Sequence, residues 1–88
     1  MANLRHAAVR AYERHGLLVT NADLDAAALD IIATLADTFP RAVLLQVKPT
    51  GVEIWLVRLC GRAVRVAYLP KYATIMSVLP DRSNWQER

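Results

Sequence analysis

The spacing of apolar residues changes near residue 40, and this change limits the possible folds more than any other feature of the chain. Before it, apolar side chains recur three and four residues apart, as they do along one face of a helix. From residue 42 onward, β-branched and aromatic residues dominate and turn residues interrupt them, which is typical of strands. Since 88 residues suffice for one domain, the pattern predicts an α+β fold: two N-terminal helices packed on one face of a four-stranded antiparallel β-meander.

The first helix is predicted over residues 2–15. Gly16 follows it at the position where a left-handed C-cap residue is common, directly after a basic last turn. The apolar stripe that should meet the core consists of Leu4, Ala7, Ala8, Ala11 and Tyr12.

The second helix is predicted to begin at Thr20 or Asn21 and to end at Pro40. Thr20 with Asp23 three residues later approximates a capping box, in which each side chain satisfies the other residue's main-chain N–H. The apolar face of this helix carries Leu24, Ala28, Ile31, Leu35 and Phe39.

The strands are predicted over residues 42–48, 52–60, 62–69 and 73–79. Each connection contains proline or glycine, and the connections are Pro49-Thr50-Gly51, Cys60-Gly61 and Pro70-Lys71-Tyr72. The domain is therefore predicted to span residues 1–80, and residues 81–88 are predicted to form a polar C-terminal tail.

The Cys60-Gly61 turn fixes the register of the two central strands if it is a two-residue hairpin. Side chains alternate between the faces of a sheet, so one face then carries Trp55, Val57, Leu59, Val64 and Val66. This bulkier set should lie under the helices. The other face carries Arg58 and Arg65, whose burial without partners would be prohibitive, so it must be partly open.

Arg58, Arg65 and Ser77 are the first candidate site. Pairing Leu69 with Ala73 across the last connection places Ser77 opposite Arg65, on the open face. Clustered guanidinium groups bind phosphate and stabilise the charge of a phosphoryl transition state. The alternative is that each arginine pairs with an aspartate of the second helix or with the C-terminal carboxylate.

His6 is the candidate acid or base, because histidine exchanges protons near neutral pH and Arg10 is its neighbour one helical turn away. A merely solvated histidine is the alternative, and the helix dipole alone explains His15. Tyr68, Tyr72 and Trp85 could stack on bases, or else cover apolar surface. The predicted nucleic-acid-binding residues are Arg10, Arg62, Lys71 and Tyr72.

Several classes of protein are excluded by composition. Cys60 is the only cysteine, which rules out an internal disulfide and fits a cytoplasmic protein. No stretch resembles a signal peptide or reaches the length of a membrane span. Gly-rich phosphate loops and metal-binding spacings are also missing. We therefore expect no metal, no cofactor and no membrane partner.

The charge distribution is uneven. Residues 21–40 contain four acidic and no basic residues, whereas the rest of the chain contains 11 basic and 4 acidic residues. Such separation indicates a surface that attracts polyanions, although solubility alone is the competing interpretation.

The chain resembles the RelE/BrnT-like group of small toxins, which has the barnase–EndoU–colicin–RelE-like fold. The segments that carry the resemblance are LRHAAVRAYERHGL, GVEIWLVRLCGRAVRVAYLP and ATIMSVLP. It implies metal-independent RNA cleavage, in which a ribose 2′-hydroxyl attacks the adjacent phosphate. It also implies that His6 and Arg10, with Arg58, Arg65 and Ser77, contribute to the site. The chain departs from the group in having no histidine or basic cluster directly after the last strand.

Two functions follow as hypotheses. The first is a metal-independent endoribonuclease, the toxin of a toxin–antitoxin pair, whose protein antitoxin covers the open basic face. The second is a non-catalytic phage- or prophage-type protein that binds and inhibits a host protein or nucleic-acid machine through its acidic helix or a sheet edge. A homodimer through a sheet edge is a further alternative.

Overall fold

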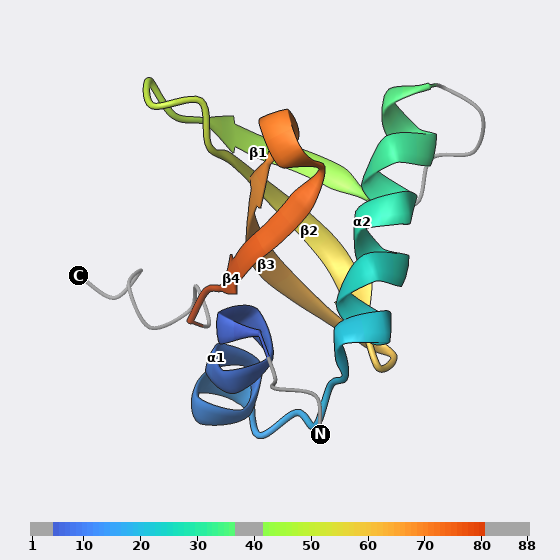
Figure 1. The fold of residues 1–88 in the computed structure, drawn as a ribbon, viewed down its shortest axis with the longest axis vertical. Helices are drawn as coiled ribbons and strands as arrows, with labels where there is room; N and C mark the ends of the chain where they lie inside the picture. Colours follow the sequence, from blue (N-terminus) through green and yellow to red (C-terminus); the bar gives the residue numbers. More distant parts are fainter. Residues whose placement is uncertain (1–4, 37–41, 81–88) are drawn as a thin grey trace.

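The computed structural model describes residues 5–36 and 42–80. Two helices precede four strands that form one antiparallel sheet in the order β1-β2-β3-β4 (Figure 1). The elements are α1 (His6–His15), α2 (Asn21–Leu35), β1 (Val43–Val47), β2 (Glu53–Leu59), β3 (Arg62–Leu69), the 3-10 turn η1 (Pro70–Tyr72) and β4 (Thr74–Val78). The predicted α+β architecture is confirmed. The predictions for Leu4, Phe39, Pro40 and the tail lie outside the described residues.

Both helices pack on the same face of the sheet, which we call the core face. Trp55, Val57 and Val66 on this face are almost completely buried, and they belong to one cluster with Leu24 and Ile31 of α2. The helices divide the face between them: α1 packs mainly on β4, and α2 packs on β2 and β4. No helix of the described residues packs on the opposite face, which carries Arg58 and Arg65; we call it the open face, although Ile54 and Ala67 on it are buried. No helix in the described part of the chain is long and apolar enough to cross a membrane.

The end of α1 agrees with the predicted left-handed cap. Gly16 has φ 66°, and it donates its N–H to the Tyr12 carbonyl at 2.9 Å. The buried side of the helix consists of Ala7, Ala8 and Ala11, as expected. Tyr12 does not belong to it, because its side chain is 60% exposed. Three alanines bring α1 close to the sheet and leave no room under the helix for a tyrosine ring.

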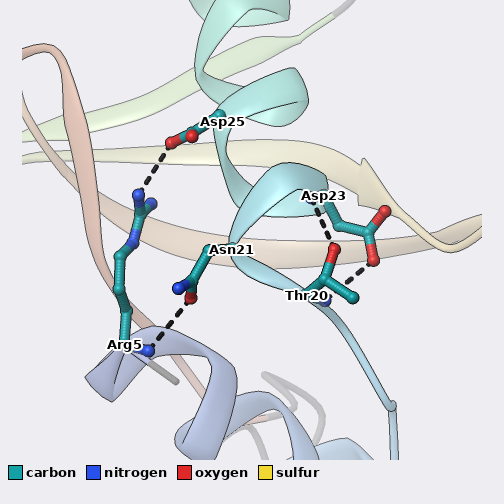
Figure 2. A network of polar contacts seen from close by, with 5 residues as sticks. All are labelled: Arg5, Thr20, Asn21, Asp23 and Asp25. Atoms are coloured by element: carbon teal, nitrogen blue, oxygen red, sulfur yellow. Dashed lines mark hydrogen bonds and ion pairs between the residues drawn. The ribbon is translucent and has the colours of Figure 1, made fainter. Parts of the chain in front are cut away.

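The start of α2 is a capping box (Figure 2). The Thr20 hydroxyl accepts the Asp23 N–H at 3.1 Å, and the Asp23 carboxylate accepts the Thr20 N–H at 2.9 Å. Arg5, just before α1, then joins the two helices: its N–H donates to Asn21, and its guanidinium forms an ion pair with Asp25 at 2.7 Å. The N-terminal ends of both helices are thereby fixed to each other.

The far end of α2 departs from the prediction. The helix ends at Leu35, and that side chain is 58% exposed although it continues the buried side of Leu24, Ala28 and Ile31. Leu35 therefore extends beyond the part of the sheet that covers the earlier turns.

The central hairpin has the predicted register. Leu59 pairs with Arg62, Val57 with Val64 and Trp55 with Val66. Cys60 has φ 53° and Gly61 has φ 79°, and positive φ at both central residues is what a type I′ turn requires. This turn matches the right-handed twist of the strands that it joins.

Both edge strands contain one extra residue relative to their neighbours. On β1, Leu44 pairs with Trp55 but Gln46 pairs with Ile54, so the register shifts around Leu45. On β4, Ile75 pairs with Tyr68 but Ser77 pairs with Ala67, so the register shifts around Met76. Extra residues of this kind are β-bulges, and they change which side chains point to each face.

The bulge in β4 corrects the predicted position of Ser77. Leu69 pairs with Thr74 rather than with Ala73, and Ser77 lies opposite Ala67 instead of Arg65. The physical reason is burial, because the bulge lets both Ile75 and Val78 point into the core, where each is at most 1% exposed.

The structure of the hairpin predicts the effect of replacing Cys60. A side chain with a Cβ in the left-handed region costs about 1 kcal/mol, and asparagine tolerates that region best. Cys60→Asn should therefore raise the free energy of unfolding by about 0.5–1 kcal/mol. Urea denaturation followed by the fluorescence of buried Trp55 measures this change.

Gly61→Ala is the matched change at the same turn. A Cβ on Gly61 meets no atom within 4 Å, so any loss reports only the backbone conformation. It should lower the unfolding free energy by about 1 kcal/mol. A Cys60→Asn variant that is no more stable than the parent would contradict the turn assignment.

The raised pKa of Tyr68 predicts how the free energy of unfolding changes at alkaline pH. Burial raises the pKa of Tyr68 above its usual value of 10.0, and the negative charge of Glu53 across the hairpin raises this pKa further. The resulting stabilisation is present below the pKa of the unfolded tyrosine and is lost as pH rises through the folded pKa. Tyr68→Phe should therefore lose less stability than the parent between about pH 9 and 11. Urea titrations at several pH values test this, with the exposed Tyr72→Phe as a control that should follow the parent.

Candidate nucleic-acid interface

The three predicted sheet residues share the open face and lie along a diagonal across it. Arg58 pairs with Ala63, and Arg65 is two residues further along β3. Ser77 pairs with Ala67, which is two residues beyond Arg65. Diagonal neighbours of this kind are about 7–8 Å apart. The structure therefore brings Arg58, Arg65 and Ser77 to one face in consecutive diagonal positions.

Main-chain carbonyl groups hold both arginines. The Arg58 guanidinium donates to the Gly61 carbonyl at 3.0 Å, and the Arg65 guanidinium donates to the Pro80 carbonyl at 2.9 Å. A carbonyl orients a guanidinium without neutralising its charge, so the bond to Gly61 aims Arg58 and leaves its attraction for anions in place. The carboxylates of the first turns of α2 are used elsewhere, since Asp23 caps the helix and Asp25 pairs with Arg5.

A groove of about 280 Å³ lies beside Arg65. Leu45 of β1, Leu56 of β2 and Ala63 of β3 contribute its apolar part. The remaining lining residues are Val64, Arg62, His15 and Pro80. The groove thus combines apolar surface from three strands with two guanidinium groups and one imidazole.

His15, at the end of α1, belongs to this groove although sequence reasoning favoured His6. Its Nε2 lies 2.7 Å from the carbonyl oxygen of Leu79. A carbonyl only accepts hydrogen bonds, so Nε2 carries a proton and Nδ1 is the acceptor of the neutral ring. That Nδ1 is buried and has no hydrogen-bond partner.

Two arginines reinforce the position of His15. Arg14 donates to the Val78 carbonyl at 2.9 Å, and Arg62 donates to the His15 carbonyl at 3.3 Å. The last turn of α1 is therefore fixed against the end of β4 and the start of β3. The basic last turn before Gly16 was visible in the sequence, but its contact with residues 64 positions away was not.

His6 lies apart from the sheet arginines. Its Nε2 accepts a hydrogen bond from Arg10 Nε at 3.2 Å, and Arg10 also forms an ion pair with Glu13. Since α1 packs on the core face, His6 and Arg10 are separated by the sheet from Arg58 and the open face. The structure does not bring the predicted acid or base together with the predicted phosphate ligands.

Lys71 and Tyr72 lie at the other end of β3 from Arg62. Seven strand steps separate Arg62 from Leu69, which corresponds to about 23 Å, and η1 follows directly. The Lys71 ammonium lies 5.6 Å from the centre of the Tyr72 ring, a cation–π contact. The two residues are exposed but do not line the groove. Tyr68 is 2% exposed and belongs to the core, so it cannot stack on a base, and Trp85 lies outside the described residues.

Within residues 5–36 and 42–80, no three His, Cys, Asp or Glu side chains lie close enough together to hold a metal ion. The chemistry available at the groove is therefore the binding of an anion by guanidinium groups and proton exchange by an imidazole.

Comparisons with known proteins leave the family open: no family model, no curated protein and no solved structure matches the chain. The resemblance to RelE-like toxins stays a prediction from the sequence.

Proposed function

We propose that this protein binds single-stranded RNA across the open face of its sheet. The observation that carries the proposal is the groove in which Arg62 and Arg65 flank an apolar surface formed by Leu45 and Leu56. Guanidinium groups bind phosphate oxygens in pairs, and apolar surface receives the face of an unpaired base. The groove therefore suits a ligand that carries both phosphate groups and exposed bases, and a single-stranded nucleic acid carries both.

The charge balance supports the same ligand. Arg58, Arg62 and Arg65 lie at or near the hairpin end of the sheet and hydrogen bond to main-chain carbonyls. Arg58 and Arg65 share the open face, so a polyanion that crosses the diagonal from β2 to β4 would meet these two cations in succession, while Arg62 lines the groove from the other face of β3. Single strands are favoured over duplexes, because the apolar surface is reached only by bases that are free to turn outward.

Metal-independent cleavage of the bound RNA is the second candidate, and the position of His15 in the groove favours it. Attack by a ribose 2′-hydroxyl needs a group that accepts its proton, and the Nδ1 atom of His15 has the required lone pair. Because this atom is buried in the structure, the RNA reaches it only after a local rearrangement around His15. A toxin of a toxin–antitoxin pair would have this activity.

The binding proposal predicts a large effect of the sheet arginines. In the variant Arg58→Gln/Arg65→Gln, each side chain keeps a hydrogen-bond donor for its carbonyl but loses its charge. Affinity for a fluorescent single-stranded RNA should fall by at least about a hundredfold, since charge-assisted contacts are worth about 1.5–3 kcal/mol each and two are lost. The slope of log affinity against log salt should become shallower by about 1.4, because two phosphate contacts are lost. Fluorescence anisotropy in EDTA measures both quantities.

The matched control is Lys48→Gln/Lys71→Gln, which removes the same charge from exposed positions that do not line the groove. It should retain most of the affinity and most of the salt slope. Equal losses in the two double variants would mean that net charge alone attracts RNA, and the proposed interface would then be wrong.

The cleavage candidate predicts different roles for the two histidines. His15→Gln should abolish cleavage of single-stranded RNA in EDTA, a loss of at least about a hundredfold, whereas His6→Gln should cleave like the parent. Gel analysis of the products measures this, and an RNA with deoxyribose in place of ribose should bind without being cut. If the parent protein binds RNA and cuts none, the cleavage candidate is excluded while the binding proposal stands.

A further inference from the structure

The strand β1 forms an open edge of the sheet. It pairs with β2 on one side, and no strand in the described part of the chain pairs with its other side. The opposite edge is protected differently, because α1 packs heavily on β4. All five side chains of β1 are exposed, and a strand edge also presents main-chain N–H and C=O groups for pairing.

The side chains of β1 are unusual for an edge strand. The apolar ones are exposed by 40% to 58%, and they are Val43, Leu44, Leu45 and Val47. Proteins normally protect an open edge with charged residues or proline, because an apolar edge invites pairing with another chain. Inside β1 there is no charge and no proline. An edge of this composition is suited to a partner strand.

The charges around the edge indicate what kind of partner it accepts. Residues 42–52, which include β1, contain one basic residue, Lys48, and no acidic residue. Arg58 adds a second positive charge on β2, two residues beyond the pairing of Leu56 with Val43. The next acid after residue 52 is Glu53, whose carboxylate accepts a hydrogen bond from the Trp55 indole at 2.9 Å. The edge therefore attracts an acidic segment.

A second copy of this chain fits the edge poorly. Antiparallel self-pairing centred on Leu45 would place Lys48 opposite Ala42 of the other copy, so neither lysine would meet an acidic partner. The bulge opposes it as well. Val43 pairs with Leu56 of the open face and Val47 pairs with Glu53 of the core face, so the two residues that a symmetric pairing would set opposite each other point to different faces.

We infer that the β1 edge binds an extended, acidic segment of a partner protein, which adds to the sheet as a strand beside β1. The main-chain groups of β1 supply the hydrogen bonds of such an addition, and alternate side chains supply its specificity. Lys48 and Arg58 select acidic over basic segments. A partner strand need not obey two-fold symmetry, so the bulge at Leu45 does not prevent its pairing.

The experiment uses the full chain and a short peptide of alternating valine and glutamate as probe. We expect the peptide to slow amide hydrogen exchange in β1, measured by NMR, while the amides of β4 are unchanged. A peptide of alternating valine and lysine should give little protection. A glutamate peptide that is N-methylated at every residue has no main-chain N–H to donate along either edge, and it should not protect β1.

Two matched variants test the role of charge. Lys48→Glu should weaken binding of the glutamate peptide about fivefold, since one exposed ion pair is worth up to about 1 kcal/mol. Lys71→Glu makes the same change in η1 and should leave the affinity unaltered. Equal binding of the glutamate and lysine peptides, or no protection of β1 by any peptide, would overturn the inference. Protection of β1 that appears without peptide and grows with protein concentration would assign the edge to a second copy instead.

Discussion

The pairing of β2 with β3 determines the rest of this structure. A two-residue turn at Cys60-Gly61, with both residues at positive φ, sets every pair in the hairpin. That register turns Trp55, Val57 and Val66 toward the helices and leaves Arg58 and Arg65 on the other side. A slip by one residue would exchange the two sets, burying guanidinium groups and exposing the core. The hydrophobic layer and the basic surface are thus two results of one local geometry.

Features that depend on neighbouring residues were predictable from the sequence. The left-handed cap at Gly16, the capping box of Thr20 with Asp23 and the hairpin register each involve residues within a few positions of one another. Their short range leaves few competing arrangements. The same reasoning correctly assigned Trp55 to the core, because the face that it occupies follows from the hairpin.

Features that depend on distant packing were not predictable. The contact of His15 with Leu79 joins residues 64 positions apart, and no periodicity in the sequence indicates it. Tyr12 and Leu35 continue apolar stripes, yet both are exposed. The close approach of α1 leaves no room under it for the Tyr12 ring, and Leu35 extends beyond the part of the sheet that covers the earlier turns of α2. Ser77 was predicted to pair with Arg65 but pairs with Ala67, because a bulge leaves no signature in the sequence of a strand rich in apolar residues. The two sheet arginines share one face as predicted, and the histidine that lines the groove beside Arg65 is His15, whereas His6 lies apart from it. The roles assigned to these residues stay predictions.

The two surfaces to which we assign binding are different parts of one sheet. The groove is lined by residues of three strands and by His15 of α1, and its two arginines, Arg62 and Arg65, come from opposite faces of β3. The β1 edge instead offers its main-chain N–H and C=O groups in the plane of the sheet. Leu45 belongs to both, because it lines the groove and is the residue around which the β1 register shifts. Ligands of the two surfaces would therefore meet at a single side chain.

The extra residue in β4 also affects how this strand tolerates evolutionary change. Ile75 and Val78 both face the core only because two residues of β4, Met76 and Ser77, lie opposite a single residue of β3, Ala67. Exchanging Met76 for another side chain alters an exposed position. Deleting it would turn each later side chain of β4 to the other face of the sheet and would move Leu79, whose carbonyl contacts His15. Homologues of this protein should accordingly vary freely in the identity of residue 76 while keeping the number of residues between η1 and Pro80 constant.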